Sequence, residues 1–550
     1  MSLRRALPRG ARVTGVRLPE GRHFALTWSI PDTFGGMTDA LLRRSAAFHR
    51  LDGVTVDVLT FDARTDTPEI ELELRRRGVL VDGVRVTNLY DWLRRHPLPG
   101  GSLQLDRDVF TPIDASTPDE ADGIEIHGRG AHIMSRSRVD AEGRTLQLDH
   151  YRDDGTLLLS DRRDTRVRGV LGGRSVVLCD AEGRPVRSWR GIRPLYRAWI
   201  DALTGGRPSF LIIDSKTVAP LLLGYRRPHI VTAHVVHASH RSADSEQHPI
   251  RRSRREVFEQ LDGFDLVVLL SRRQRDDVER LVGRHDHLTV IPNARPLPQR
   301  PATAPGPGPR ERDRGVVLAA LTRRKRVSHA IDAVQRANAA FFATGPAAGR
   351  PAGPAGPPVR LDVYGDGESR PALERRITDP AAVRLHGFDP GARRQLLEAS
   401  FLLLTSHSEG FPLVLVESMA AGCLPIAYDI PYGPADLIRD GRNGFLVPAG
   451  DVDALAAAIV RLQRMSPQRV ARMRAHAVRT AARFDERRVT QLWAGAFEQA
   501  VVRRAAHGSE RFRGIRSLTA KLPLPRPVRA LGARLVVGAD RVFRAPGRVG

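Results

Sequence analysis

The sequence predicts an α/β protein of more than one domain, and three observations lead to this expectation. Short apolar strands alternate with helices and meet them at glycine corners, as in open parallel sheets whose ligands bind at the strand ends. A Pro/Gly-rich stretch over residues 296–309 interrupts that alternation and is typical of a linker. Residues 69–190 contain alternating segments around Asp-Gly turns, which favours a β-rich insertion.

The N-terminal part is expected to open with a strand over residues 24–30, a helix over about 39–50 and a second strand over 54–61. Gly35 and Gly36 lie between the first strand and this helix. Two adjacent glycines at such a junction let a phosphate or a sugar approach the backbone closely. The same pair also fits an ordinary turn.

A further strand over residues 231–236 is predicted to emerge into a loop at His237. A histidine at the carboxyl end of a strand in such a sheet points toward the ligand crevice, so His237 is a candidate site residue, ahead of His234 and His240. The spacing of these histidines also suits zinc. Neither a cysteine pair nor a nearby carboxylate completes a ligand set, however, and we expect no metal.

The most informative stretch is residues 406–422, in which seven residues separate Glu409 from Glu417. Pro412 suits the first turn of a helix, so Glu409 should lie on the loop before the helix and Glu417 more than one turn inside it. Free N–H groups at a helix start bind anions, and acidic side chains there can bind hydroxyls. The arrangement suits a ligand with both a phosphate and a sugar, although an amphipathic helix with two solvated glutamates has the same spacing.

Lysine is rare in this chain, which has 87 basic residues but only three lysines, Lys216, Lys325 and Lys521. Lys325 follows a predicted strand over residues 316–321 and precedes a helix that should start near Ser328. A lysine in an arginine-rich background marks a place that prefers a compact point charge, as diphosphate sites do, although chance gives the same pattern.

Composition limits the classes of protein that fit. A length of 550 residues predicts two or three domains, and a hydrophobic content of 41% supports real cores. Aromatic residues make up 5%, which argues against stacking platforms for single-stranded nucleic acid. Two cysteines, Cys179 and Cys423, imply no disulfide framework. Because no signal-peptide or membrane-spanning run is apparent, we expect a cytoplasmic protein.

The net charge of +25 attracts polyanions: nucleic acid, anionic lipid or an anionic polymer. The chain shows no zinc-finger or RNA-recognition motif, so we expect no nucleic-acid partner. The basic segment 503–550 contains an amphipathic pattern over residues 528–543. This pattern fits peripheral contact with the inner membrane face and fits a solvated tail equally well.

Several motifs together resemble the retaining, nucleotide-sugar-dependent glycosyltransferases of the GT-B fold, family 4. These are the Glu409-x7-Glu417 run, its Gly-Phe pair, and the Asp-Gly-x-Asn-Gly turn at residues 440–444. Similar strand ends lie at residues 266–271, 290–293, 359–368 and 385–388. The resemblance covers about residues 214–484 and a short N-terminal piece.

This resemblance implies an α/β protein with two Rossmann-like domains facing across a cleft. The domain limits expected from it are an N-terminal acceptor domain over 1–298 with the insertion at 69–190, a C-terminal nucleotide-sugar domain over 310–484, a helix over 485–505 that crosses back to the N-terminal domain, and a basic tail over 506–550.

Residues 35–38, 235–240 and 428–434 are similar to a narrower subgroup, the poly(glycerol-phosphate) and poly(ribitol-phosphate) glycosyltransferases of wall teichoic acid. The resemblance implies a hexosyltransferase that uses UDP-glucose or UDP-N-acetylglucosamine as its donor substrate and needs no other cofactor. The acceptor is a polyol-phosphate polymer, another envelope glycan or a lipid-linked precursor. In some members of the subgroup the β-rich insertion builds a trimer, which makes a homo-oligomer an expectation here.

The same resemblance assigns roles to individual residues. It makes Glu409, Lys325 and His237 catalytic, with Glu409 near C3 of the transferred sugar. It assigns to the donor Glu417 at the ribose, Phe388 near the nucleobase, Gly35 and Gly36 at the sugar phosphate, and Gly410, Phe411, Pro412 and Leu413 at the diphosphate. Ala320 stands where the family usually has an arginine, and Arg323 or Arg324 is the candidate replacement.

Two other classes of protein stay open on sequence grounds. Paired carboxylates also serve glycosidases as acid and nucleophile, but those enzymes need neither a lysine at a helix start nor Rossmann-like halves. A nucleic-acid-binding protein would rest on the net charge alone.

Overall fold

The computed structural model describes residues 15–32, 34–105, 109–114, 123–241, 249–296, 310–343 and 358–521. The expected linker, apart from Pro296, and the amphipathic segment at 528–543 lie outside the described residues. The chain divides into two compact units. Unit 1 comprises Met1–His234, Ser253–Leu266 and Ala494–Gly550, and unit 2 comprises Val235–Arg252 and Val267–Trp493. The domain limits expected at residues 298, 310 and 484 stay predictions.

A seven-stranded sheet has the order β13-β12-β11-β10-β1-β2-β3. Its strands are β1 (Arg22–Leu26), β2 (Val56–Thr60), β3 (Val84–Asn88), β10 (Ser209–Ile213), β11 (Ile230–Val236), β12 (Leu266–Leu269) and β13 (Leu288–Val290). β1 pairs in parallel with both β10 and β2, so the strand order changes direction between β1 and β10. Leu26, Val58 and Ile213 are fully buried, as expected for parallel strands covered on both faces.

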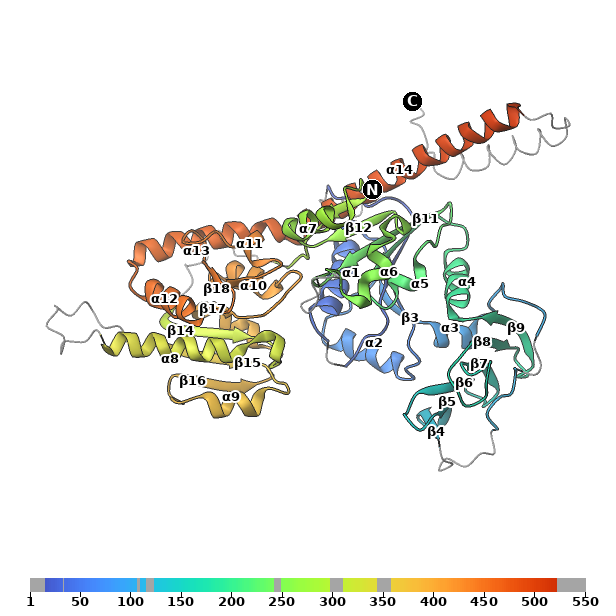
Figure 1. The fold of residues 1–550 in the computed structure, drawn as a ribbon, viewed down its shortest axis with the longest axis horizontal. Coiled ribbons are helices and arrows are strands. Elements are labelled where there is room, and N and C mark those ends of the chain that lie inside the picture. The colour runs from blue at the N-terminus through green and yellow to red at the C-terminus, as the bar shows by residue number, and fades with distance from the viewer. Residues whose placement is uncertain are drawn as a thin grey trace, which may run out of the picture. The chain divides into compact units, whose positions relative to one another are not determined.

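The helices that accompany this sheet lie between its strands along the chain (Figure 1). They are α1 (Gly36–Asp52), α2 (Thr67–Arg76), α3 (Leu89–Arg95), α4 (Ile192–Thr204), α5 (Ala219–Leu222), α6 (Arg252–Phe258) and α7 (Arg272–Val282). Gly53 ends α1 in the left-handed conformation (φ 75°), which suits a residue without a side chain.

The β-rich insertion is a six-stranded antiparallel meander, ordered β4 to β9 along the chain. Its strands are β4 (Ile124–Arg129), β5 (His132–Val139), β6 (Thr145–Tyr151), β7 (Leu157–Arg162), β8 (Ser175–Cys179) and β9 (Pro185–Arg190). The hairpins β6–β7 and β8–β9 form around the Asp-Gly and Glu-Gly turns, as predicted. The meander starts later than residue 69, because β3 pairs in parallel with β2 and so belongs to the first sheet.

Unit 2 contains a six-stranded parallel sheet with the order β16-β15-β14-β17-β18-β19. The strands are β14 (Glu311–Leu318), β15 (Arg360–Tyr364), β16 (Val383–Gly387), β17 (Ala399–Leu404), β18 (Leu424–Asp429) and β19 (Phe445–Pro448). Its helices are α8 (Val327–Ala343), α9 (Arg370–Arg376), α10 (Leu413–Ala421), α11 (Pro434–Leu437), α12 (Val452–Gln463) and α13 (Pro467–Ala481). In chain order the strands run 3-2-1-4-5-6, which is the doubly wound Rossmann arrangement with its switch between β14 and β17.

The last described element is one long helix, α14 (Glu486–Lys521). It starts in unit 2 and belongs to unit 1 from Ala494 onward. Within unit 1, Phe497 packs 4.9 Å from Phe210 and Arg504 lies 3.1 Å from Asp265. The helix therefore continues beyond residue 505, where the sequence suggested a tail. No helix within the described part of the chain combines the length and the apolar character that crossing a lipid bilayer requires.

Candidate functional site

The loops after β14 and β17 meet at the switch point of the unit 2 sheet. β14 leads into a 3-10 turn, Arg323–Lys325, and β17 leads into the loop that carries Glu409. The two loops are joined by hydrogen bonds: the His407 N–H donates to the Arg324 carbonyl (2.8 Å) and the Thr405 hydroxyl to the Lys325 carbonyl (3.0 Å). Ligands of doubly wound sheets bind beside such a point.

Lys325 and Glu409 form an ion pair there, with 2.6 Å between Nζ and Oε1. Arg324 lies 3.4 Å from the same carboxylate oxygen, and its guanidinium also donates to the Ser408 carbonyl (2.9 Å). Burial would raise the pKa of Glu409, but the Lys325 and Arg324 charges outweigh burial and hold the pKa below its usual value. The Glu409 carboxylate is therefore ionised and able to accept hydrogen bonds from sugar hydroxyls.

The start of α10 is the place where the sequence predicted anion binding. Pro412 occupies the N-cap position, and no side chain caps the first turn. Leu413 begins the helix, and Phe411 and Leu413 are buried. The uncapped start leaves backbone N–H groups for a ligand phosphate, and Lys325 adds a full positive charge nearby.

Two glycines hold the Glu409 loop in close contact with its surroundings. A Cβ atom on Gly410 would overlap the His237 main-chain carbonyl, and one on Gly433 (φ +104°) would overlap the Pro412 ring. The Tyr432 N–H donates to the Glu409 carbonyl (3.1 Å). His237 is thus brought against the loop through its backbone, with its side chain half-buried.

The other two histidines near His237 have packing roles. In unit 1, His234 is buried and its Nδ1 lies 3.0 Å from the Ile213 carbonyl. In unit 2, His240 is buried with its ring stacked on Tyr432 (5.6 Å between centroids). Both rings are therefore packed in the protein interior, whereas the His237 side chain is half-buried.

Glu417 projects from α10 and is paired with two arginines that the sequence did not single out. Its Oε1 lies 2.6 Å from Arg295 Nε and 3.0 Å from Arg393 Nε. The Arg295 side chain is 5% exposed and that of Arg393 is 52% exposed. Glu417 is thus held between a buried and an accessible cation. In an arginine-rich chain no local signal marks these two partners.

Phe388 follows β16, and 67% of its surface is exposed. Within the described residues, no hydrogen bond, ion pair or ring contact joins it to the Lys325–Glu409 pair. An exposed ring of this kind is free to stack on a planar ligand group. Next to it along the chain, His386 stacks on Tyr364 (4.5 Å) and lies 2.7 Å from an oxygen of Asp362.

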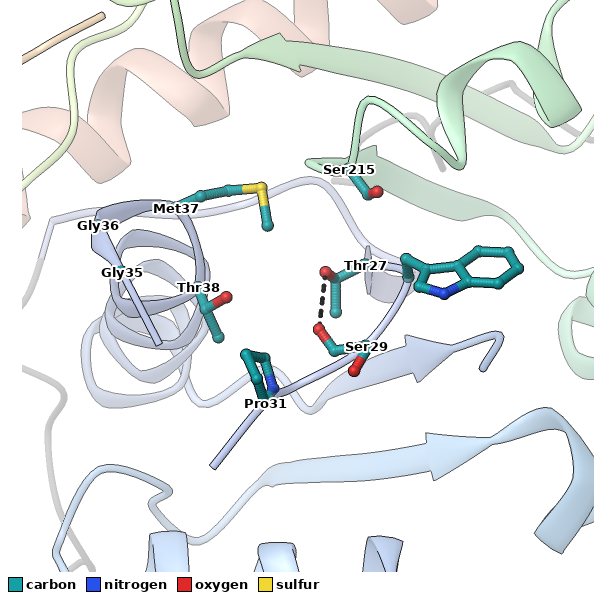
Figure 2. Close-up of a pocket in the computed structure, with 9 residues that line it drawn as sticks. Thr27, Ser29, Pro31, Gly35, Gly36, Met37, Thr38 and Ser215 are labelled. Carbon is teal, nitrogen blue, oxygen red and sulfur yellow. Dashed lines mark hydrogen bonds between the residues drawn. The ribbon is translucent and has the colours of Figure 1, made fainter. Parts of the chain in front are cut away.

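Unit 1 has a pocket of its own, which we name the β1 pocket. It has a volume of about 440 Å³ and lies at the carboxyl ends of β1 and β10 (Figure 2). Its lining consists of Thr27, Trp28, Ser29, Pro31, Gly35, Gly36, Met37, Thr38 and Ser215. The two glycines predicted to approach a sugar phosphate therefore line a real cavity, which also sits at a switch in strand order.

Two Rossmann-like sheets define the GT-B fold of sugar-transferring enzymes, and the β4–β9 meander is an addition to that fold. Residues 314–464 match the family described as "Glycosyl transferases group 1". The protein is accordingly a glycosyltransferase, as the sequence predicted.

Curated relatives match over most of the chain. Poly(glycerol-phosphate) alpha-glucosyltransferase of Bacillus subtilis (strain 168) is 21% identical over 531 residues, covering 88% of this chain and 76% of the relative. Poly(ribitol-phosphate) alpha-N-acetylglucosaminyltransferase of Staphylococcus aureus (strain COL) is 20% identical over 482 residues, covering 78% of this chain and 90% of the relative.

Solved structures support the fold in the same way. S. aureus TarM, crystallised as a mutant with fondaparinux, alpha-GlcNAc-glycerol and UDP, gives a TM-score of 0.68 at 17% identity. The similarity covers 87% of this chain and 100% of TarM. The pneumococcal O-GlcNAc transferase GtfA, in complex with UDP and GlcNAc, gives a TM-score of 0.60 at 18% identity. This similarity covers 88% of this chain and 99% of GtfA.

Proposed function

We propose that the protein is a retaining, family 4 glycosyltransferase that moves a hexose from a UDP-sugar to a hydroxyl of a polyol-phosphate polymer. The observation that carries the proposal is the Lys325–Glu409 pair at the switch point of the unit 2 sheet. A cation, an uncapped helix start and an ionised carboxylate lie together there. These are the groups that a nucleotide diphosphate joined to a sugar requires.

Each part of the donor substrate is assigned to one of these groups. Lys325 and the main-chain amides of residues 410–413 would bind the diphosphate, Glu417 the ribose hydroxyls and Glu409 the transferred sugar near C3. As the bond from C1 to the phosphate breaks, negative charge grows on the leaving diphosphate, and Lys325 is placed to stabilise it. In this proposal a phosphate oxygen of the leaving group accepts the proton of the acceptor hydroxyl, so the site needs no separate base.

Three further residues are assigned on resemblance. Gly35 and Gly36 would approach the sugar phosphate of the donor, a role that suits their position in the wall of the β1 pocket. His237 would lie near the transferred sugar, supported by its backbone contact with Gly410. Phe388 would lie near the nucleobase, supported by its exposure.

The acceptor is proposed from the curated relatives. Both act on a polyol-phosphate polymer by name, and one transfers glucose while the other transfers N-acetylglucosamine. A net charge of +25 suits a phosphodiester polymer, which is attracted by the same counterion release that governs nucleic acids. Another envelope glycan or a lipid-linked precursor is the alternative acceptor.

The cellular location, oligomeric state and membrane contact of the enzyme are also proposed. Cys179 and Cys423 are both free and buried, which suits a reducing cytoplasm. A homo-oligomer built by the β4–β9 meander and a peripheral membrane contact of the C-terminal residues rest on sequence alone. Light scattering and liposome co-sedimentation test these two proposals directly.

The glycosidase alternative fits the site poorly. A glycosidase needs one carboxyl group with a raised pKa to act as the acid. The pKa of Glu409 is lowered instead, and two arginines pair with Glu417. Glu409 is therefore suited to accept hydrogen bonds rather than to donate a proton.

The test is a panel of radiolabelled sugar nucleotides, first without acceptor and then with poly(glycerol-phosphate) or poly(ribitol-phosphate). We expect slow hydrolysis of one UDP-sugar and transfer of its sugar to a polymer, with the product anomer retained by NMR and with EDTA without effect. The absence of UDP binding by calorimetry, together with no turnover of any sugar nucleotide, contradicts the proposal.

A further inference from the structure

The β1 pocket has the position and size of a small-molecule site, although the donor chemistry is concentrated in unit 2. It opens where the first sheet switches direction, between the ends of β1 and β10. Its volume of about 440 Å³ is within the usual range for ligand sites, about 300–1,000 Å³. Apart from Gly35 and Gly36, none of its lining residues is assigned to the donor.

The lining combines hydroxyl groups with apolar surface. Four of its residues carry hydroxyls: Thr27, Ser29, Thr38 and Ser215 (Figure 2). Pro31, Met37 and Trp28 supply apolar surface, and Trp28 is 36% exposed although it is a large aromatic residue. An indole offers a flat apolar face and one N–H donor. Such a wall fits a molecule with C–H groups on one side and hydroxyls on the other, as a polyol has.

A positively charged residue lies next to the pocket lining along the chain. Lys216 follows the lining residue Ser215 directly, and its side chain is exposed. Lys325 forms an ion pair with Glu409, whereas Lys216 makes no ion pair among the described residues. The neighbouring Asp214 does not cancel this charge, because Arg44 neutralises it through two buried hydrogen bonds of 2.9 and 2.7 Å. Lys216 is therefore available to a ligand phosphate.

The charges near the other side of the pocket differ. Asp32 follows the lining residue Pro31 and is exposed, and Arg64 binds both Asp32 (2.6 Å) and Asp66 (2.7 Å). Two carboxylates thus share one guanidinium, and this side repels a phosphate but accepts hydrogen bonds from hydroxyls. The charge distribution favours one orientation of a polyol phosphate, with its phosphate toward Lys216.

We propose that the β1 pocket binds one polyol unit of the acceptor, with Trp28 covering its carbon chain and Lys216 binding the adjoining phosphate. This inference rests on the proposed function and adds to it the residues that recognise the acceptor. Because Gly35 and Gly36 line the same cavity, a hydroxyl bound there lies beside the glycines assigned to the donor's sugar phosphate.

The test compares Lys216→Ala and Trp28→Ala with the native enzyme by two measurements. Calorimetry gives the affinity for a glycerol-phosphate oligomer without needing turnover, and initial rates give KM for the polymer. Each substitution should weaken oligomer binding and raise KM for the acceptor by about tenfold, as the loss of one charge-assisted contact or one stacking surface predicts. Lys216→Arg and Trp28→Phe should recover most of the affinity, and the Kd for UDP should stay within about twofold.

Arg207→Ala is the matched control, because Arg207 is an exposed cation just before β10, at the opposite end of the strand from Lys216. It removes the same charge without touching the pocket and should leave oligomer affinity unchanged. Oligomer affinity that is unchanged in Lys216→Ala and Trp28→Ala, or lost equally in Arg207→Ala, overturns the inference. A parallel loss of UDP affinity assigns the pocket to the donor and overturns it too. Failure of the native enzyme to bind UDP contradicts the proposed function instead.

Discussion

Lys325 Nζ lies 2.6 Å from Glu409 Oε1, and the two residues come from loops that follow neighbouring strands at the switch point of one sheet. In chain order they are 84 residues apart, so the fold alone brings them together. The pair is 19% and 12% exposed, and solvent therefore screens it little. This ion pair places one cation and one anion at the point where the proposed function requires a sugar diphosphate to bind.

Lys325→Ala should reduce kcat by a factor of about 100 to 1,000, because the charge that stabilises the leaving diphosphate is lost. Lys325→Arg should recover part of the rate, since the charge stays but the bulkier guanidinium fits the compact site less well. The measurement is steady-state transfer with UDP-sugar and polymer, together with circular dichroism to check the fold. Activity within a factor of three of native would contradict the assigned role.

Arg324→Ala should reduce donor affinity by about tenfold, and adding Ala320→Arg to this variant should restore it. Ala320 follows β14 and is exposed. It occupies the position at which the family that this chain resembles usually has an arginine. Arg324 lies 3.4 Å from Glu409 and is 52% exposed, so it can take over a phosphate contact. Calorimetry with UDP measures both steps, and Arg323→Ala is the neighbouring control. Failure of the double variant to recover would show that Arg324 does not replace the missing arginine.

Acid inactivation should begin at higher pH when a cation beside Glu409 is removed. Its pKa is lowered because Lys325 and Arg324 outweigh the effect of burial, so the carboxylate stays charged at neutral pH. Its favourable contribution is present above the unfolded pKa and is lost as pH falls through the lowered folded value. Arg324→Gln raises that pKa, so the acid limb of kcat/KM should move toward higher pH. A limb that stays in place would mean that Glu409 does not control it.

The sequence could predict Lys325 and Glu409 but not the partners of Glu417. Lys325 is one of three lysines in a strongly basic chain, and Glu409 precedes a recognisable helix start. Arg295 and Arg393 belong to a background of 84 arginines, the 87 basic residues less three lysines. Tertiary packing decides which arginine contacts Glu417, and the local sequence pattern carries no information about that packing.

Two differences in the fold have equally simple causes. The residues Val-Arg-Val-Thr of β3 alternate between apolar and polar like a hairpin strand, and a period of two does not identify the pairing partner. The basic composition after residue 505 suggested a tail. No proline lies between the start of α14 at Glu486 and Pro523, however, and the helix continues to Lys521.

Tyr432→Phe should lower kcat by about three- to tenfold with little change in the fold. The Tyr432 hydroxyl contacts Asp277 and lies 3.1 Å from Arg241 Nε, while its N–H holds the Glu409 carbonyl. Phenylalanine keeps the ring on His240 but loses the hydroxyl contacts that fix the Glu409 loop. Asp277→Asn should act in the same direction, and the double variant should add little, since both remove one network. Fully additive losses would argue against a shared positioning role.

Glu417→Ala should weaken UDP binding by about tenfold to a hundredfold, because the ribose hydroxyls lose an ionised acceptor.

The two arginines around Glu417 should behave differently from each other. Arg393 is 52% exposed, so Arg393→Ala removes a weak, solvated ion pair and should cost less than about 1 kcal/mol of stability. Arg295 is 5% exposed, and Arg295→Ala leaves a carboxylate that is 13% exposed with only the solvated Arg393, which should cost about 3 kcal/mol. Urea unfolding measures both costs, calorimetry with UDP measures the affinity, and Glu398→Ala, which removes an exposed glutamate, is the control. Native UDP affinity in Glu417→Ala would exclude this carboxylate from the nucleotide site and leave the Lys325–Glu409 pair to bind the donor without it.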